Sequence, residues 1–287
     1  MTHVPNSART PTSARTPDAD AHTIDATVNY IVDNGERLFN YTGGAGSTER
    51  RTGGTPDPRR VTIHDGRPFV SDFALDRHGF RFVDHDTAVK DFFDEAEIRS
   101  LYYREMEDLV AKESGARRVV VFDHTLRTAD DAEREARKIR EPVSRVHNDY
   151  TEWSGPQRVR DLLPDEADDL LTRRFAIIQV WRPIRHPVET MPLAICDAQS
   201  VSFDDFVISE RIYPDRKGQT YAALYRPQHM WYWFPRMRRD EALVFKVYDS
   251  TTGGVARWTA HTAFEDPSAP PGARPRESIE IRTLAFF

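Results

Sequence analysis

The pattern of apolar and polar positions changes character near residue 145. Before that point the strongest signal is a helical one over residues 94–114, and its apolar positions at helical spacing are Ile98, Leu101, Tyr102, Leu109 and Val110. Asp94 and Glu97 fit a capping box at its start, and Gly115 stands where a C-terminal cap belongs. The pattern predicts one amphipathic helix, followed by a strand at 118–122.

Beyond residue 145 the chain consists mainly of short apolar runs bounded by Pro, Gly, Asp or Ser. These runs lie at 174–181, 192–198, 205–213, 220–225, 229–234, 242–249, 256–264 and 277–287. Only 156–163 and 164–173 have a helical pattern there, each with a proline suited to a first helical position. Many short strands with regular turn signals are typical of a β-sandwich or barrel, such as a jelly roll. We therefore expect an α+β, mainly β fold, with the helical front half packed outside the sheets.

Three polar segments complete the predicted organisation. Residues 1–24 contain the near-repeat SARTP and TSARTP and few large apolar side chains, which predicts a disordered tail before a single domain at 25–287, whose first apolar element is 27–32. The segment 42–60 carries five glycines and two prolines, which predicts a loop. The charged run 129–140 predicts a solvated helix.

Charge and cysteine content restrict the function classes. The 287 residues carry a formal net charge of −6, which excludes a globally basic nucleic-acid binder. No apolar run approaches 18 residues and the N-terminus lacks an apolar signal region, so we expect a cytoplasmic protein without a membrane span. Because Cys196 is the only cysteine, a metal would have to be bound by His, Asp and Glu, and ten histidines are available.

The first candidate for metal binding is the pair His147 and Asp149. Residues i and i+2 of a strand project from one face, so the two side chains can coordinate one metal ion. The pair alone is weak evidence, since one such spacing is expected by chance and a surface histidine beside a turn carboxylate would look the same. His261, 112 residues after Asp149, is the natural third ligand. Two histidines and one carboxylate form the facial triad that suits non-haem Fe(II), with open positions for co-substrate and oxygen.

The C-terminal strand offers an anion-binding pattern. Arg276 and Ser278 share one face, and Arg282 lies on the same face. A guanidinium with a neighbouring hydroxyl can bind a carboxylate. The alternative is an edge strand with a solvated polar face.

Further candidates surround the apolar runs. If Gln179 and Trp181 point inward, Gln179 can bond a keto acid and Arg182 can reach a substrate carboxylate at the end of the strand. The alternative places Trp181 in the core and Arg182 in a salt bridge. Tyr225 and Trp231 belong to the most aromatic region, which forms either jelly-roll core or the wall of an organic-substrate pocket.

The second half of the chain resembles the CmcJ-like hydroxylases and desaturases, a branch of the Fe(II)/2-oxoglutarate-dependent oxygenases of natural-product pathways. The resembling strings span about 145–287. They are VHNDYT at 146–151, VWRPI at 180–184, PLAICDAQS at 192–200, WYWFPRM at 231–237, EALVFKVYDS at 241–250, the segment 256–264 and PRESIEIR at 275–282.

The resemblance implies a double-stranded β-helix core with His147, Asp149 and His261 as iron ligands. It implies 2-oxoglutarate and O2 as co-substrates, with Arg276 on the distal carboxylate of 2-oxoglutarate, Ser278 assisting, and Arg274 and Arg282 as rivals. The substrate would be a small molecule, hydroxylated, desaturated or cyclised.

Two other functions remain open at this stage. One is an accessory jelly-roll partner of a methyltransferase or another tailoring enzyme. The other is a Zn²⁺ hydrolase that uses the same three ligands. The sequence leaves open a partner enzyme or a homodimer.

Overall fold

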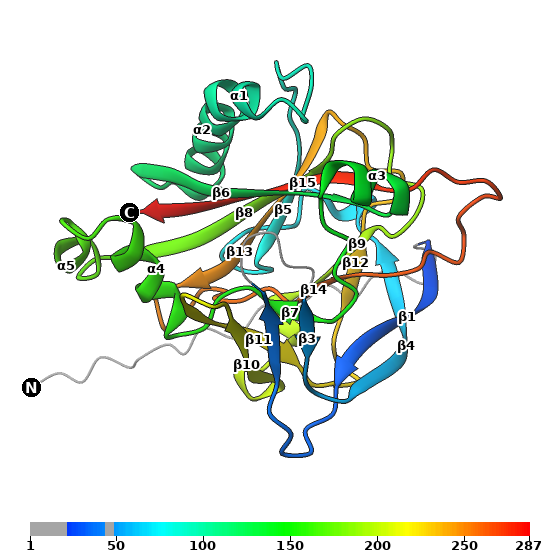
Figure 1. Ribbon diagram of the computed structural model, residues 1–287, viewed down its shortest axis with the longest axis horizontal. Coiled ribbons are helices and arrows are strands. Elements are labelled where there is room, and N and C mark those ends of the chain that lie inside the picture. Colours follow the sequence, from blue (N-terminus) through cyan, green and yellow to red (C-terminus); the bar gives the residue numbers. More distant parts are fainter. Residues whose placement is uncertain (1–21, 44–48) are drawn as a thin grey trace, which may run out of the picture.

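The computed structural model describes residues 22–43 and 49–287, and two β-sheets packed face to face dominate it (Figure 1). Residues 1–21 of the predicted disordered tail lie outside the described part of the chain. The prediction of a jelly-roll, mainly β fold is confirmed. The assignment of 25–287 to a single domain stays a prediction.

The smaller sheet has five strands, all antiparallel, in the order β5-β13-β8-β15-β6. Their bounds are β5 Phe80–Asp84, β6 Arg118–Thr128, β8 Phe175–Pro183, β13 Glu241–Asp249 and β15 Glu277–Phe286. The last strand in sequence order, β15, thus lies between β8 and β6. The predicted strand at 118–122 continues to Thr128, six residues beyond its expected end.

The predicted helix covers the outer face of this sheet (Figure 1). It begins as α1 (Glu95–Glu97), continues through a π-helical turn (Ile98–Tyr102) and ends as α2 (Tyr103–Ser114). The Asp94 carboxylate accepts from two amides of the first turn, and Gly115 has the left-handed φ of 75° expected of the cap. The reciprocal half of the capping box is absent, because the Glu97 carboxylate accepts instead from the amides of Lys90 and Asp91.

The larger sheet has ten strands in the order β1-β4-β12-β9-β14-β7-β11-β10-β2-β3. Their bounds are β1 Thr23–Ile31, β2 Phe39–Thr42, β3 Arg50–Thr52, β4 Pro56–Asp65, β7 His147–Asn148, β9 Leu193–Cys196, β10 Phe206–Ile212, β11 Lys217–Ala223, β12 Trp231–Trp233 and β14 His261–Ala263. The strands β4 and β12 pair in parallel, as do β2 and β10, so the sheet is mixed. The predicted strand at 256–264 shrinks to the three residues of β14.

The prediction of a loop over 42–60 was wrong where the chain is described. Its second half forms β3 and the start of β4, and residues 44–48 lie outside the described part. Pro56 and Pro58 pair with β1 on one side, whereas β12 contacts β4 only from Ile63 onward. A proline is tolerated at such an unpaired edge, where its missing N–H would have had no strand partner.

The described residues also contain three short α-helices, α3 (Asp131–Arg137), α4 (Ser154–Leu162) and α5 (Ala167–Leu170), and three 3₁₀ turns at Arg67–Phe69, Ala198–Ser200 and Phe203–Asp205. The expected helices are present, but Pro156 lies in the first turn of α4 rather than at its start, and Pro164 precedes α5 by three residues. Among the described residues no helix has the length and apolar character needed to cross a bilayer.

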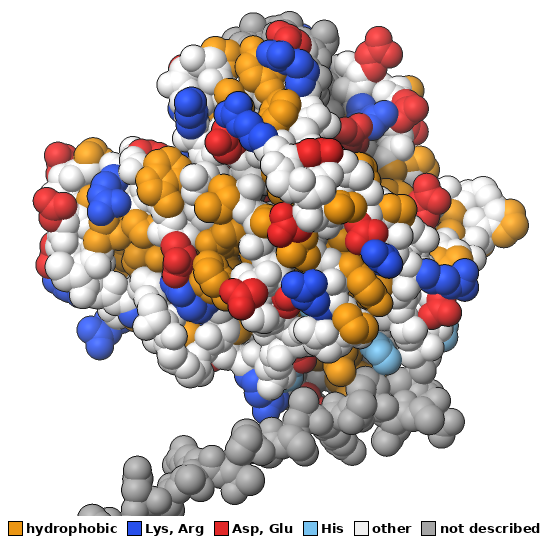
Figure 2. Space-filling view, turned by 90° about the horizontal axis from the view of Figure 1, so that it is seen from below, with side chains coloured by type: hydrophobic (Ala, Val, Ile, Leu, Met, Phe, Trp, Pro, Cys, Tyr) orange, Lys and Arg blue, Asp and Glu red, His pale blue; other side chains and the backbone are white. Residues whose placement is uncertain are grey.

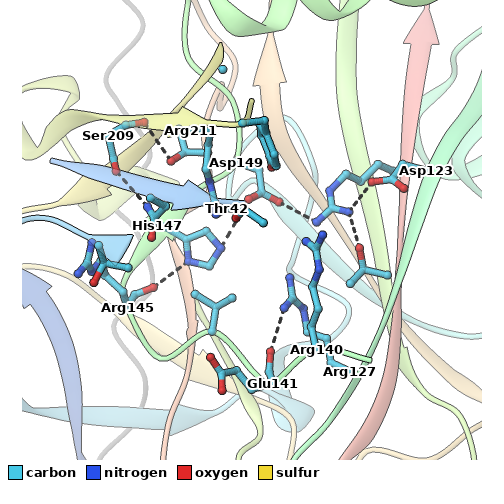
Figure 3. A pocket seen from close by; sticks show the side chains of 18 of the residues that line it. Thr42, Asp123, Arg127, Arg140, Glu141, Arg145, His147, Asp149, Ser209 and Arg211 are labelled. Carbon is cyan, nitrogen blue, oxygen red and sulfur yellow. Dashed lines mark hydrogen bonds and ion pairs between the residues drawn. The ribbon is translucent and has the colours of Figure 1, made fainter. Parts of the chain in front are cut away.

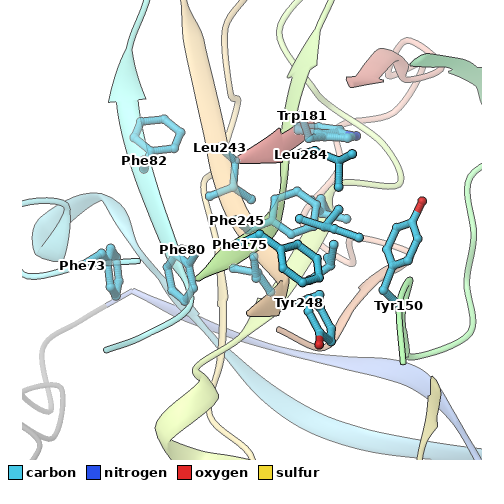
Figure 4. Packing of buried hydrophobic residues seen from close by; sticks show 14 of the residues in the cluster. Phe73, Phe80, Phe82, Tyr150, Phe175, Trp181, Leu243, Phe245, Tyr248 and Leu284 are labelled. Carbon is cyan, nitrogen blue, oxygen red and sulfur yellow. The ribbon is translucent and has the colours of Figure 1, made fainter. Parts of the chain in front are cut away.

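An aromatic core fills the space between the two sheets (Figure 4). Phe175 and Trp181 of β8 face it, together with Leu284 and Phe286 of β15. The same inward face of β15 turns polar toward its start, at Ser278, Glu280 and Arg282, all with little exposure. Buried polar groups need partners, so this transition from apolar to polar positions marks where a site can form.

Candidate functional site

The three predicted metal ligands meet at the centre of the larger sheet. His147 and His261 are direct cross-strand partners on β7 and β14, with ring centroids 4.3 Å apart, and Asp149 follows β7. One ligand atom from each residue lies within 4.8 Å of the others. Residues separated by 112 positions are therefore brought together by strand pairing.

Backbone carbonyls fix both imidazole rings. Nδ1 of His147 lies 2.8 Å from the carbonyl oxygen of Arg145, and Nδ1 of His261 lies 3.0 Å from that of Thr259. Because a carbonyl only accepts, each Nδ1 carries the proton and donates, which leaves the Nε2 lone pair free. Burial and the neighbouring His261 lower the pKa of His147 to about 3, so its ring is neutral at pH 7.

Gln179 and Arg282 hold the Asp149 carboxylate. Nε2 of Gln179 donates to Oδ2 over 2.5 Å, and a guanidinium nitrogen of Arg282 lies 3.5 Å from the same oxygen. Burial raises the pKa of Asp149, but Arg282 and the two histidines outweigh it and hold that pKa below its usual range. The aspartate is therefore an ionised ligand fixed in orientation.

Arg276 is buried just before β15 without an anionic partner among the described residues. It is 3% exposed and donates to the Met191 carbonyl over 2.6 Å, and no carboxylate of the described residues lies within ion-pair distance. Its Nε and the Ser278 hydroxyl are buried without any partner. Burial and the charge of Arg127 lower the pKa of Arg276 to about 9. A bound carboxylate would supply the missing charge and acceptors.

The two rival arginines differ from Arg276 in their surroundings. Arg282 is paired with Asp123 and Glu280 besides Asp149. Arg274 lies on an exposed loop, where its side chain contacts His186. Of the three candidate arginines, all within the described residues, only Arg276 is buried without an anionic partner.

The donor set fits Fe(II). Two imidazole nitrogens and one ionised carboxylate lie within reach of one another, and His261 Nε2 is buried without a partner. The unpartnered atoms of Arg276 and Ser278, with Gln179 Oε1, add the groups that a keto acid with a distal carboxylate would need.

Three sequence candidates lie elsewhere. Strand alternation directs Gln179 and Trp181 inward, so Arg182 points outward beneath the helix and donates to the carbonyls of His85 and Arg239. The salt bridge expected as the alternative for Arg182, with Asp197 or Glu189, does not form; these three residues all lie in the described part of the chain.

Tyr225 and Trp231 also lie away from the site, in a cluster that contains residues of β1, β4, β9 and β12 of the larger sheet. Trp231 is fully buried there and donates to the Tyr30 hydroxyl over 2.9 Å. These residues form core, which was the alternative left open for them.

Sequence reasoning missed Arg127, which lies opposite Ser278 on β6 with its backbone in register. Extending the alternation of 118–122 would have placed residues 124, 126 and 128, and not Arg127, on the inward face. A β-bulge at Phe122 shifts the register, so that residues 123, 125 and 127 face inward instead.

A cavity of about 1800 Å³ opens onto His147, Asp149 and Arg282 (Figure 3). Met191 and Ala129 line it and hydrogen-bond to Arg276. Arg145 and Arg211 also line it, and the charge of Arg211 contributes, after burial, to lowering the pKa of both Arg145 and His147. His147 and Asp149 are thus accessible to a small molecule from a strongly cationic cavity.

Comparisons with known proteins agree with this site. A family model described as "Oxidoreductase/YMDC permease-like domain" matches residues 28–286. The hydroxylase/desaturase efuI of Hormonema carpetanum is 32% identical, with 92% of this chain and 95% of that protein covered. The alpha-ketoglutarate-dependent dioxygenase tstK of Talaromyces stipitatus is also 32% identical, with 79% and 84% covered.

Among solved structures, the iron and alpha-ketoglutarate-dependent endoperoxidase NvfI superposes with a TM-score of 0.81 at 29% identity. The match covers 92% of this chain and 98% of that one. The chain therefore belongs to this oxidoreductase family, the CmcJ-like hydroxylases and desaturases among the Fe(II)/2-oxoglutarate-dependent oxygenases.

Proposed function

We propose that the protein is an Fe(II)/2-oxoglutarate-dependent dioxygenase that oxidises a small natural-product substrate, with the iron held by His147, Asp149 and His261. One observation carries the assignment of the ligands: the buried Nε2 of His261 has no partner, yet it faces ligand atoms of the two other residues. The relatives' activities support the same chemistry for this chain.

Bound Fe(II), with 2-oxoglutarate and O2, would supply an oxidant able to attack an unactivated C–H bond. The residues around the triad prepare the iron site. The carbonyls of Arg145 and Thr259 keep both Nε2 atoms free of protons, and Gln179 and Arg282 keep Asp149 oriented and ionised. Phe245 packs edge-on against His261 with ring centroids 4.9 Å apart, so one side of the site is dry.

We assign the distal carboxylate of 2-oxoglutarate to Arg276, with the Ser278 hydroxyl as a second donor. The guanidinium lies 5.4 Å from the ring centre of Trp181, which limits its movement. Arg282 is already neutralised by carboxylates and Arg274 is exposed, so neither offers an equivalent site.

The two sheets build this site jointly, which supports a single domain over 25–287. His147 and His261 belong to the larger sheet, whereas Gln179, Ser278 and Arg282 belong to the smaller one. Whether the substrate is hydroxylated, desaturated or cyclised depends on where its C–H bonds lie in the cavity. We also propose a cytoplasmic location, with which the single, buried and free Cys196 is compatible.

The rival functions have less support. An accessory subunit would not need three converging ligand atoms around a buried gap. A Zn²⁺ hydrolase would not need a buried arginine that lacks an anion.

The direct test is anaerobic addition of Fe(II) and 2-oxoglutarate to the purified protein. We expect the visible absorption band of the iron–keto-acid complex in wild-type protein and its loss in His147→Ala. His186→Ala removes an exposed histidine outside the triad and should keep the band. No band in the wild type, or an unchanged band in His147→Ala, would refute the proposal.

A further inference from the structure

The cavity has a charge opposite to that of the whole chain. Ten lysine and arginine residues line it against six aspartate and glutamate residues, an excess of four positive charges in a chain of net charge −6. On the face shown in Figure 2, acidic and basic side chains are instead interspersed among apolar ones. A cavity lined by one sign of charge concentrates ligands of the other sign.

Most of the carboxylates that line the cavity are already neutralised. Asp123 and Asp149 contact Arg282, and Asp131 and Glu141 contact Arg134. By contrast, six arginines of the lining form no ion pair within the part of the chain that the structure describes. They are Arg127, Arg140, Arg145, Arg158, Arg211 and Arg216.

Arg145 and Arg211 are the two that flank the iron ligands. Arg145 precedes His147 by two residues along an extended segment, which separates their backbones by about 7 Å. Arg211 lies on β10, in register with Asn40 of β2. Figure 3 shows both arginines on the His147 side of the cavity, with Arg127 and Arg140 across from them.

Neither of these two side chains is held by a structural anion. Both are half-buried, and the Arg145 guanidinium has only a 3.4 Å contact with the Gly53 carbonyl. Two half-buried like charges side by side are unfavourable unless an anion lies between them. Guanidinium groups suit carboxylate and phosphate because their N–H pairs match two oxygens at once.

This anion site is separate from the one assigned to 2-oxoglutarate. Arg276 directly precedes β15 and Ser278 lies on it, in the five-stranded sheet, whereas Arg211 lies on β10 of the ten-stranded sheet and Arg145 precedes β7 of that sheet. One dicarboxylate held by Arg276 cannot also neutralise them.

We propose that the primary substrate carries an anionic group, a carboxylate or a phosphate ester, which Arg145 and Arg211 bind while the carbon to be oxidised lies next to the iron ligands. This inference rests on the proposed function, because it places the substrate relative to the metal site. The substrate is therefore an organic acid or phosphate whose reactive carbon lies a few bonds from its charge.

The test uses three probes of one shape: phenylacetate, phenyl phosphate and the neutral phenylacetamide. Their affinity is measured by calorimetry in anaerobic low-salt buffer, on protein with Fe(II) and 2-oxoglutarate and on metal-free protein. We expect both anions to bind at least tenfold more tightly than the amide. The tighter anion identifies the natural group as carboxylate or phosphate.

Variants separate the two anion sites. Arg211→Gln and Arg145→Gln should each weaken the anionic probes at least tenfold and keep the iron–keto-acid band. Arg276→Gln should lose the band and retain probe binding. Arg160→Gln, an exposed arginine on α4 outside the cavity, is the matched control and should change neither.

The inference is overturned if the amide binds as well as the anions, if probe binding survives in folded Arg211→Gln and Arg145→Gln, or if those variants lose 2-oxoglutarate. Circular dichroism establishes folding. Absence of the band in wild-type protein would refute the proposed function instead, and probe binding to the metal-free protein would still decide this inference.

Discussion

The arginines near the site differ more in their ion-pair partners than in their positions. Arg276 directly precedes β15 and Arg282 lies on it, yet Arg276 lacks an anion among the described residues and Arg282 contacts three. The resemblance placed Arg276 first for 2-oxoglutarate and kept Arg282 as a rival, because spacing alone could not separate them. The ranking depends on Asp123, which lies far away in sequence and reaches Arg282 only through the pairing of β6 with β15.

Replacing Arg276 by Gln should weaken 2-oxoglutarate strongly. Loss of one member of a buried ion pair costs about 2–4 kcal/mol, or roughly 30- to 1000-fold in affinity. Anaerobic titration of the iron–keto-acid band measures the effect. Arg274→Gln, on the exposed loop, should leave the affinity unchanged; equal losses in both variants would contradict the assignment.

Gln179→Leu should weaken iron binding while the protein stays folded. The substitution removes the 2.5 Å hydrogen bond that orients Asp149, and such supporting contacts typically contribute about 10- to 100-fold in metal affinity. Competition with a chelator gives the affinity. An unchanged metal affinity would mean that Arg282 alone positions the carboxylate.

At the scale of elements, periodicity predicted the long buried strands well and the short ones poorly. The apolar runs of β8 and β13 are found within two residues of their expected bounds. The β4 strand was missed because its prolines and arginines face an unpaired edge, which composition alone cannot distinguish from a loop. Sequence reasoning missed Arg145 and Arg211, because whether an arginine has an ion-pair partner depends on the tertiary structure.

The turn before β5 supports the metal site from a distance. Gly79 has a φ of 85°, and a Cβ there would lie 2.2 Å from the Thr259 hydroxyl. Thr259 in turn holds His261 through its carbonyl. Gly79→Ala should therefore cost more than the ~1 kcal/mol of a left-handed glycine alone and should weaken metal binding.

Gly115→Ala is the matched control for this change, because Gly115 has a similar φ and open space around it. Urea unfolding and a chelator titration of both variants provide the comparison. Equal destabilisation, with iron affinity intact in Gly79→Ala, would show that the contact with Thr259 is unimportant.

For the whole molecule, buried histidines make stability depend on pH. Burial lowers the pKa of His147 and of His229, so the unfolded chain binds more protons than the folded one below pH 6.5. Stability is complete above pH 6.5 and is lost as pH falls toward the folded-state values. At pH 5.5 each histidine contributes a loss of up to about 1.4 kcal/mol.

Urea unfolding of the metal-free protein at pH 7.5 and 5.5 measures this loss. His229→Asn removes one of the two groups and should reduce the difference between the two pH values. A free energy of unfolding that does not change over this range would contradict the prediction.

The position of β15 has a consequence for the order of events during synthesis. This strand follows every other described strand in the sequence, yet it separates β8 from β6 in the smaller sheet. Until the ribosome releases it, β6 has no strand partner and β8 has one open edge. Ser278 and Arg282 arrive with this strand and Arg276 just before it, so a nascent chain already containing His147, Asp149 and His261 would still be unable to retain the keto acid.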